Sequence, residues 1–266
     1  MKDQLTLYGR SFASRLLLGT ARYDSPALLA DAIRVAEPAL LTVSLRRQLL
    51  GSKESGESFW NLLRETKRTL LPNTAGCVTA QEAVKTACMA RELFQTNLIK
   101  LEVIGDEVNL QPDPFGLVEA AIELVKLGFH VLPYCTEDWI LCRRLIDAGC
   151  EVLMPWAAPI GTGQGPRNPR ALRELRQRSP QIPLIIDAGV GLPSQACQVM
   201  EWGFDGVLLN TAVSRSLDPI RMARAFANAV SAGRSAFLAG PMIVQEAAVS
   251  STPEIGRPFS LALGRV

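Results

Sequence analysis

Lys100 and Glu102 lie two positions apart in the stretch N-L-I-K-L-E-V-I at residues 97–104, which has the composition of a β-strand. Side chains in a strand alternate between two faces, so this amine and this carboxylate point the same way while Leu101 and Val103 point the other way. Burying an ammonium and a carboxylate in a core strand costs free energy. An ion pair tolerated at the rim of a sheet is the simplest interpretation of a single pair of this kind.

Lys100 belongs to a scarce residue type, because the chain has six lysines and 22 arginines. Its neighbours in the sequence are Ile99 and Leu101, so we expect its side chain to be desolvated. A desolvated lysine has a lowered pKa and is the residue type that forms Schiff bases with carbonyl substrates. The sequence therefore favours an imine-forming amine over a plain ion pair.

The composition is that of an ordinary globular protein, with 266 residues, 48% hydrophobic and 20% charged residues, and a formal net charge of +2. This length favours one large domain with an ample core. The small net charge argues against a nucleic-acid-binding protein, and no apolar run approaches the ~20 residues that cross a bilayer. The N-terminal residues lack the pattern of a signal peptide, so we expect a cytoplasmic location.

Metal and disulfide chemistry have little support in the sequence. The six cysteines form no C-x-x-C pair and His130 is the only histidine, so an ordinary zinc site is close to excluded. We expect reduced, mostly buried cysteines, no bound metal and no cofactor. His130 opens a predicted strand and is expected to be structural. Cys77 lacks a histidine partner unless His130 reaches it, which argues against a thiol nucleophile.

Short β-rich runs alternate with amphipathic stretches along the chain. The predicted strands are residues 15–19, 39–45, 69–73, 98–104, 130–134, 151–155, 183–189 and 206–210. The predicted helices include residues 79–93, 113–127, 136–148, 169–177, 193–202 and 218–232. Helix starts are indicated by the capping residues Thr79, Asp113, Thr136, Asn168 and Asp218. Helix ends are indicated by Gly128, Gly149, Gly203 and Gly233.

Eight strand-then-helix units in a chain of this length predict a closed (β/α)8 barrel that forms a single domain over residues 1–266. The continuous apolar strands are typical of a parallel sheet covered on both faces. A doubly wound open sheet is the alternative. Two stretches are irregular: residues 50–57 are expected to be a mobile loop, and residues 250–266 a flexible tail or a segment that closes over the site.

The carboxyl ends of barrel strands form the active site, and the loops after the last two strands often hold a phosphate. The seventh strand leads into D-A-G-V-G at residues 187–191, and the eighth into Asn210 and Thr211. Glycines let the backbone approach an anion, and N–H groups at the start of the next helix supply donors. These features favour a phosphate site.

Asp187 ends an apolar strand at the barrel mouth, and two interpretations have nearly equal weight. It either caps the following turn or acts with Lys100 and Glu102 in proton transfer beside an imine. The glycine-rich segment 154–165 is either a flexible connection or a clamp over an extended substrate or a phosphate.

Five motifs make the chain similar to a known family. L-P-N-T-A-G-C (71–77), I-K-L-E-V-I-G (99–105), P-I-G-T-G-Q-G (159–165), D-A-G-V-G (187–191) and G-V-L-L-N-T-A-V (206–213) occur in order and in register. Together they resemble the thiazole synthases of thiamine biosynthesis, of the bacterial and plastid type. The resemblance runs from about residue 14 to about residue 240 and so covers most of the chain.

The resemblance implies a (β/α)8 barrel that condenses 1-deoxy-D-xylulose 5-phosphate, an imino-glycine (dehydroglycine) and sulfur into a thiazole phosphate carboxylate. The sulfur comes from the C-terminal thiocarboxylate of a ubiquitin-like carrier protein, and the family forms homotetramers. Lys100 matches the family's Schiff-base lysine, and Glu102 and Asp187 match its acid/base carboxylates. The positions that hold the sugar phosphate correspond to Gly161, Ala188, Gly189, Asn210 and Thr211.

Three residues depart from the family pattern and could alter the carrier channel or the loop packing. Trp156 replaces a small or aliphatic residue, Cys135 stands near a usual threonine, and Ser44 near a usual alanine. Nothing is carried over for residues 50–57 or for the C-terminal tail. Two other functions remain open, namely another Schiff-base sugar-phosphate enzyme of the aldolase or isomerase type, and a non-catalytic scaffold that binds the carrier.

Overall fold

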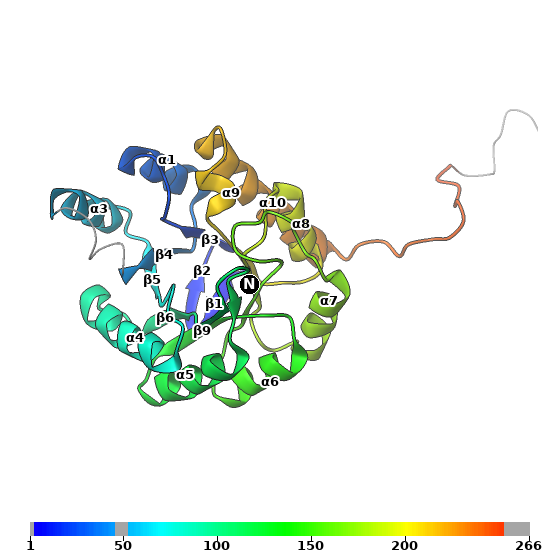
Figure 1. The fold of residues 1–266 in the computed structure, drawn as a ribbon. Helices are drawn as coiled ribbons and strands as arrows, with labels where there is room; N and C mark the ends of the chain where they lie inside the picture. The colour runs from blue at the N-terminus through cyan, green and yellow to red at the C-terminus, as the bar shows by residue number, and fades with distance from the viewer. Residues whose placement is uncertain (1–2, 46–52, 253–266) are drawn as a thin grey trace, which may run out of the picture.

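The computed structural model describes residues 3–45 and 53–252. Eight parallel strands form one sheet, in the order β10-β9-β6-β5-β4-β3-β12-β11 (Figure 1). They are β3 (Leu16–Gly19), β4 (Leu40–Ser44), β5 (Thr69–Asn73), β6 (Leu98–Leu101), β9 (His130–Cys135), β10 (Met154–Pro155), β11 (Ile185–Asp187) and β12 (Gly206–Leu209). Parallel bridges from Leu153 to Leu184 and from Trp156 to Asp187 join β10 to β11. The sheet therefore closes into the predicted (β/α)8 barrel, and the open doubly wound sheet is excluded.

The helices form a ring around the strands (Figure 1). They are α1 (Pro26–Ala36), α3 (Lys53–Glu65), α4 (Ala80–Phe94), α5 (Pro114–Lys126), α6 (Trp139–Asp147), α7 (Pro169–Arg178), α8 (Pro193–Glu201), α9 (Thr211–Ser214) and α10 (Pro219–Ala239). The predicted N-caps Thr79, Asp113, Asn168 and Asp218 are confirmed, since each side chain accepts a backbone N–H of the first turn. These caps fix where the strand-to-helix loops end, and the loops form one rim of the barrel.

One predicted helix start and one predicted helix end are wrong. The cap of α6 is Asp138 rather than Thr136, because the Asp138 carboxylate accepts the N–H of Leu141 at 2.8 Å. Gly233 does not end α10, which continues to Ala239. A Cβ at Gly233 would lie 2.3 Å from the carbonyl oxygen of Cys197, so this glycine allows α10 to pack closely on α8.

The two segments predicted to be irregular have different outcomes. Residues 50–52 of the predicted mobile loop lie outside the described residues, but residues 53–57 begin the helix α3, so the loop prediction is wrong for that part. The Gly and Ser residues indicated a loop, whereas the apolar residues that follow, including the buried Phe59 and Leu63, repeat at helical spacing. Residues 253–266 of the predicted tail lie outside the described residues.

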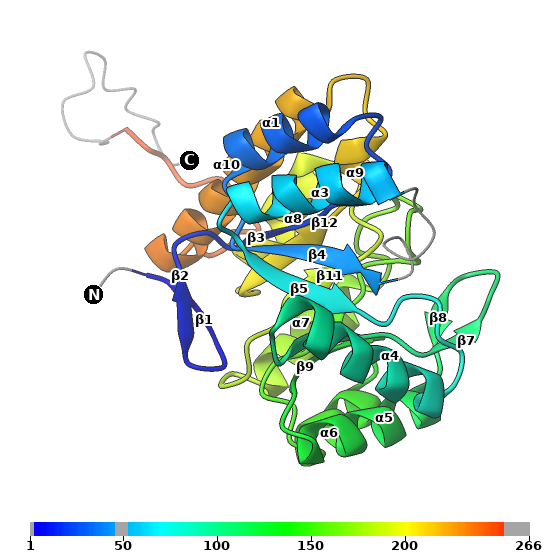
Figure 2. The same cartoon turned by 90° about the vertical axis from the view of Figure 1, so that its left-hand side faces the viewer.

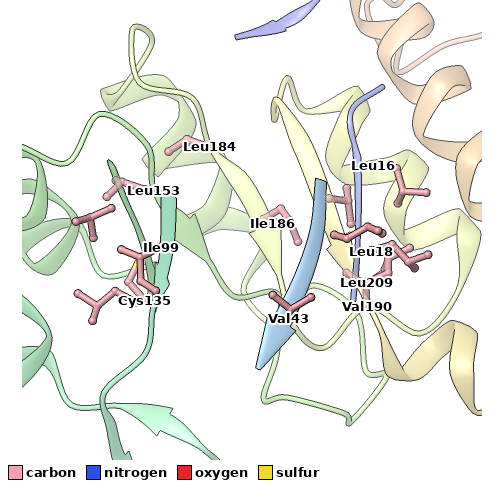
Figure 3. Packing of buried hydrophobic residues seen from close by; sticks show 14 of the residues in the cluster. Leu16, Leu18, Val43, Ile99, Cys135, Leu153, Leu184, Ile186, Val190 and Leu209 are labelled. Carbon is pink, nitrogen blue, oxygen red and sulfur yellow. The ribbon is translucent and has the colours of Figure 1, made fainter. Parts of the chain in front are cut away.

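The barrel has two apolar cores, as the alternation of side chains along its strands requires. The outer core lies between the strands and the helices and includes Leu18, Ile99 and Ile186 (Figure 3). The inner core lies inside the barrel and includes Leu17, Leu98 and other residues one position along the same strands. Because the inner core fills the amino-terminal part of the barrel, the polar side chains are left at the carboxyl ends of the strands.

A short hairpin covers the amino-terminal end of the barrel (Figure 2). It consists of β1 (Leu5–Leu7) and β2 (Arg10–Phe12), joined by Tyr8 and Gly9, which both have positive φ as a two-residue hairpin turn requires. Leu5 and Leu7 join the inner core. The Tyr8 ring stacks on His130 with centroids 4.5 Å apart, and its hydroxyl donates to the Val131 carbonyl at 2.6 Å. His130 is thus structural, as predicted.

Asp3 precedes the hairpin and accepts hydrogen bonds from Arg15 and Arg234. The Arg234 bond and, less strongly, the Arg15 guanidinium lower the pKa of Asp3 to about 2 from 3.8. A depressed pKa adds stability that is present above the unfolded pKa and is lost as the pH falls through the folded pKa. Since the Asp3 side chain is 34% exposed, we reduce the effect to about 1 kcal/mol.

Asp3→Asn is therefore expected to lower the free energy of unfolding by about 1 kcal/mol near pH 6, with a smaller deficit near pH 3. Urea unfolding of both proteins at the two pH values measures this difference. Asp31→Asn is the control, because Asp31 forms an exposed pair with Arg34 on α1 and should change the stability little. A deficit for Asp3→Asn that does not narrow with acid would contradict the assignment.

Candidate functional site

Lys100 lies inside the barrel, near the carboxyl end of β6. Its side chain is 7% exposed, and its Nζ is 2.5 Å from Asp187 Oδ2 and 3.2 Å from Glu102 Oε1. Leu101 and Val103 point outward into the other core, as the alternation predicts. The simple interpretation of an ion pair at a sheet rim is therefore excluded, because the amine is buried between two acids.

Glu102 follows the last residue of β6, since the strand ends at Leu101 and a hairpin of β7 (Ile104–Asp106) and β8 (Gln111–Pro112) begins two residues later. The predicted strand 98–104 is thus too long. The Thr74 hydroxyl holds this segment, donating to the Glu102 carbonyl at 2.8 Å and accepting the Glu102 N–H at 2.7 Å. Thr74 is completely buried and belongs to the L-P-N-T-A-G-C motif, but the sequence alone assigns it no role. The sequence feature that could have indicated Thr74 is its position as a polar residue directly after an apolar strand.

The charge of Lys100 depends on three influences. Burial is the largest and lowers its pKa, but Asp187 and Glu102 together outweigh burial and raise the pKa above its usual value. The predicted lowered pKa is wrong, because the sequence indicates the loss of water around the amine but not how closely two acids surround it. Burial also raises the pKa of Asp187, against the opposing effect of Lys100. Asp187 is thus a carboxylate with increased proton affinity at contact distance from the amine.

Two residues from other strands complete the surroundings of the amine. Asp187 ends β11 and directs its carboxylate at Lys100, while the cap of the next helix, α8, is Leu192. Tyr134 on β9 is completely buried, and the Lys100 Nζ lies 5.5 Å from the centroid of its ring. Burial, with the negative charges of Asp187 and Glu102, raises the pKa of the Tyr134 hydroxyl. This tyrosine therefore stays neutral and forms an aromatic wall beside the ammonium.

A cavity of about 870 Å³ opens above these residues. All eight predicted site residues line it: Lys100, Glu102, Gly161, Asp187, Ala188, Gly189, Asn210 and Thr211. Most of the remaining lining residues are small or apolar, which leaves room for a ligand of sugar-phosphate size. The structure therefore brings together side chains and turns that are spread over more than 100 residues of sequence.

Backbone turns after β10 and β11 form one side of the cavity. Ala188 and Gly189 both have positive φ, at 63° and 74°, and a Cβ at Gly189 would lie 2.4 Å from the Ala158 nitrogen. Only glycine allows this close approach. Ala188 is a non-glycine residue in a left-handed conformation, which is costly and tends to occur at functional sites. Gly161 is nearby, since a Cβ there would lie 3.9 Å from the Thr211 hydroxyl oxygen.

Several groups at the predicted phosphate site already have partners within the protein. The N–H groups of Gly191 and Leu192, at the start of α8, both donate to the Gln195 side chain, so they are engaged within the protein. The Asn210 amide, turned so that its nitrogen meets acceptors, donates to the carbonyls of Gly19 at 3.2 Å and Ala21 at 2.9 Å. That side chain thus holds the loop after β3. The backbone N–H of Ala188 is engaged as well, since it donates to the Asp187 carboxylate.

Trp156 lies outside this cavity. Its indole N–H donates to Glu137 at 2.5 Å, and its ring contacts the edge of Tyr134 at a centroid distance of 6.4 Å. Trp156 therefore takes part in loop packing behind the tyrosine, which is one of the two effects expected of it. The Cys135 sulfur lies 3.9 Å from that of Cys142, facing α6 rather than the amine.

No group of three or more His, Cys, Asp or Glu side chains is arranged to hold a metal ion within residues 3–45 and 53–252. Over the same residues, no helix combines the length and the hydropathy needed to span a membrane.

The chain is similar to known proteins in sequence and in fold. Residues 6–253 match the family model described as thiazole biosynthesis protein ThiG. The thiazole synthase of Neisseria meningitidis serogroup C is 65% identical over 255 residues, which cover 96% of this chain and 97% of that protein. The thiazole synthase of Paracidovorax citrulli is 64% identical over 257 residues, covering 97% and 95%. The crystal structure of the Amycolatopsis orientalis BexX/CysO complex contains a chain that superposes with a TM-score of 0.84 at 32% identity, covering 93% of this chain and all of that one.

Proposed function

This chain belongs to the ThiG family of thiazole synthases, enzymes of thiamine biosynthesis, and we propose that Lys100 is the amine that condenses with its sugar substrate. The proposed substrates are 1-deoxy-D-xylulose 5-phosphate, an imino-glycine and sulfur from a thiocarboxylated carrier protein. The product is a thiazole phosphate carboxylate. The observation that carries the proposal is a buried amine held 2.5 Å from Asp187 and 3.2 Å from Glu102 at the floor of the cavity.

The first step requires a neutral amine. Lys100 transfers its proton to Asp187, whose raised proton affinity makes it the nearest suitable acceptor. The amine nitrogen then bonds to the ketone carbon of the sugar and passes one of its protons to the ketone oxygen. A second proton, from an acid, lets that oxygen leave as water and leaves a protonated imine. Among the described residues, Glu102 and Asp187 are the two acids that can supply this proton.

The imine then allows proton transfers along the sugar. A protonated imine withdraws electrons and acidifies the adjacent hydroxyl-bearing carbon, so a carboxylate can remove a proton there. A proton is then added to the former imine carbon, and the hydroxyl of the adjacent carbon loses its proton and becomes a carbonyl. The carbonyl group thereby moves along the chain, and the sulfur attacks the relocated carbonyl carbon. Since the amine is flanked by two acids, one can act as base while the other acts as acid. A mouth that excludes water would protect both the imine and the thiocarboxylate from hydrolysis.

The phosphate is proposed to bind at Gly161, Ala188, Gly189, Asn210 and Thr211. The proposal is supported by the close approach of the backbone at Gly189 and by Gly161 and Thr211, which lie against each other and line the same cavity. The similarity to a chain of the BexX/CysO complex supports a sulfur carrier as the protein partner. The homotetramer that the resemblance implies and the cytoplasmic location expected from the sequence remain part of the proposal.

Reconstitution with the carrier tests this function. The purified protein, the sugar phosphate, an imino-glycine source and the thiocarboxylated carrier are expected to yield the thiazole phosphate, detected by mass spectrometry. Carrier with an ordinary C-terminal carboxylate is the matched control and should give no product. Conversion of the sugar phosphate at the same rate without any carrier would instead indicate an aldolase or isomerase. A protein that binds the carrier but converts nothing would be a scaffold.

A further inference from the structure

The charges that line the cavity do not by themselves favour a phosphate. Of the described lining residues, four have ionisable side chains: Lys100, Glu102, Asp187 and Arg215. The two acids and one lysine of the imine site leave a net negative charge when all are ionised. A sugar phosphate entering such a site is repelled unless a further positive group faces it. Arg215 is the one remaining cation among these described lining residues.

We propose that Arg215 is the side chain that recognises the substrate phosphate. This inference rests on the proposed function, and it extends the phosphate site beyond the backbone turns and Thr211. A guanidinium can bind two phosphate oxygens at once, which neutral backbone donors cannot match in charge. The contribution of Arg215 is thus affinity for the phosphate and orientation of the sugar, with the chemistry left to Lys100 and the two acids.

Arg215 is located beside the proposed phosphate turns. It follows the single turn of α9, and its N–H donates to the Thr211 carbonyl at 3.0 Å. Residues four positions apart on a helical turn share a face, so the side chains of Thr211 and Arg215 are neighbours. Thr211 in turn lies against Gly161 on the glycine-rich loop. Thr211, Gly161 and Arg215 all line the cavity.

The barrel order places Arg215 opposite the amine. Between β6, which carries Lys100, and β12, which leads to Arg215, there are three strands in either direction around the closed sheet. A sugar whose ketone carbon is bonded to Lys100 would thus extend across the cavity to place its terminal phosphate at β12.

Arg215 is also available for a ligand. It is exposed, and within residues 3–45 and 53–252 no carboxylate lies at ion-pair distance from it. By contrast, Arg176, Arg221 and Arg234 each form an ion pair with an aspartate. An unpaired arginine at the rim of a cavity loses little on binding an anion, since no existing pair has to break.

The test compares Arg215→Ala with the unmodified protein in a trapping assay. Borohydride reduction at increasing concentrations of 1-deoxy-D-xylulose 5-phosphate, read by mass spectrometry, gives the half-saturating concentration and the maximal fraction of adduct. Arg215→Ala should raise the half-saturating concentration by roughly tenfold or more and leave the maximal fraction unchanged. Arg215→Lys should recover part of the affinity. Arg224→Ala, an exposed arginine on α10 that does not line the cavity, is the matched control and should have no effect.

The same sugar without its phosphate distinguishes recognition of the phosphate from a structural effect. 1-Deoxy-D-xylulose should be trapped equally well by the unmodified protein and by Arg215→Ala. The proposal would be overturned if Arg215→Ala weakened trapping of both sugars equally, or of neither. Calorimetric titration with inorganic phosphate does not depend on the imine and should also be weakened by Arg215→Ala. If Arg215→Ala weakens the binding of inorganic phosphate but neither it nor the unmodified protein forms an adduct, the proposed function fails and the role of Arg215 stands.

Discussion

Lys100→Arg is expected to abolish the covalent adduct that borohydride traps with 1-deoxy-D-xylulose 5-phosphate, and thiazole formation with it. Arginine keeps a positive charge beside Asp187 and Glu102, so the ion pairs that hold the site can persist. A guanidinium is not deprotonated in proteins, however, and therefore has no neutral nitrogen to attack a ketone. Mass spectrometry of the intact protein after reduction measures the adduct directly.

Lys85→Arg provides the matched control for this variant. Lys85 is an exposed residue of α4, and reduction of that variant should give the same adduct as the unmodified protein. Peptide mapping of the unmodified protein should locate the adduct on residue 100. An adduct that persists in Lys100→Arg at the unmodified level would place the imine on a different amine and refute the assignment.

The sequence predicted the barrel and its mouth because both follow from local patterns. The alternation of Lys100 and Glu102 with Leu101 and Val103 requires only the period of a strand, and the structure places Leu101 and Val103 in the outer core as expected. The positions of the strands and of four helix caps likewise follow from neighbouring residues. The strand that contains Lys100 was predicted too long at its carboxyl end. The apolar residues Val103 and Ile104 extend its pattern, but Ile104 already belongs to a separate hairpin.

The charge of the site could not be predicted from local patterns. The sequence around Lys100 indicates burial, which alone lowers the pKa of an amine, whereas Asp187 is 87 positions further along the chain and reverses that result only through contact. Thr74 and Arg215 were missed for the same reason. Thr74 acts on Glu102 from the adjacent strand end, and Arg215 lines the cavity only because the barrel closes.

Asp187→Ala is expected to retain imine formation but to lose most turnover. Removing Asp187 deletes an opposing charge 2.5 Å from a buried ammonium, so the pKa of Lys100 should fall and the neutral amine should be available at lower pH. Trapping measured from about pH 5 to about pH 9 should therefore show adduct formation that begins at lower pH in the variant. Thiazole formation should decrease by about 10²–10⁴-fold, because one of the two acid/base groups is absent.

Asp147→Asn is the control, since Asp147 forms an exposed pair with Arg143 on α6 and should change neither measurement. The two measurements on Asp187→Ala separate a role in chemistry from a role in folding, because a misfolded barrel would lose adduct and product together.

If the variant forms no adduct at any pH, Asp187 is needed for the imine itself, and a purely later acid/base role is excluded. If adduct formation shifts toward higher pH instead, the ion pair is not what raises the pKa of Lys100. The proposal requires three results together: the adduct is retained, adduct formation begins at lower pH, and thiazole formation is slow. Only these results fit a Lys100 ammonium that Asp187 stabilises until the substrate binds.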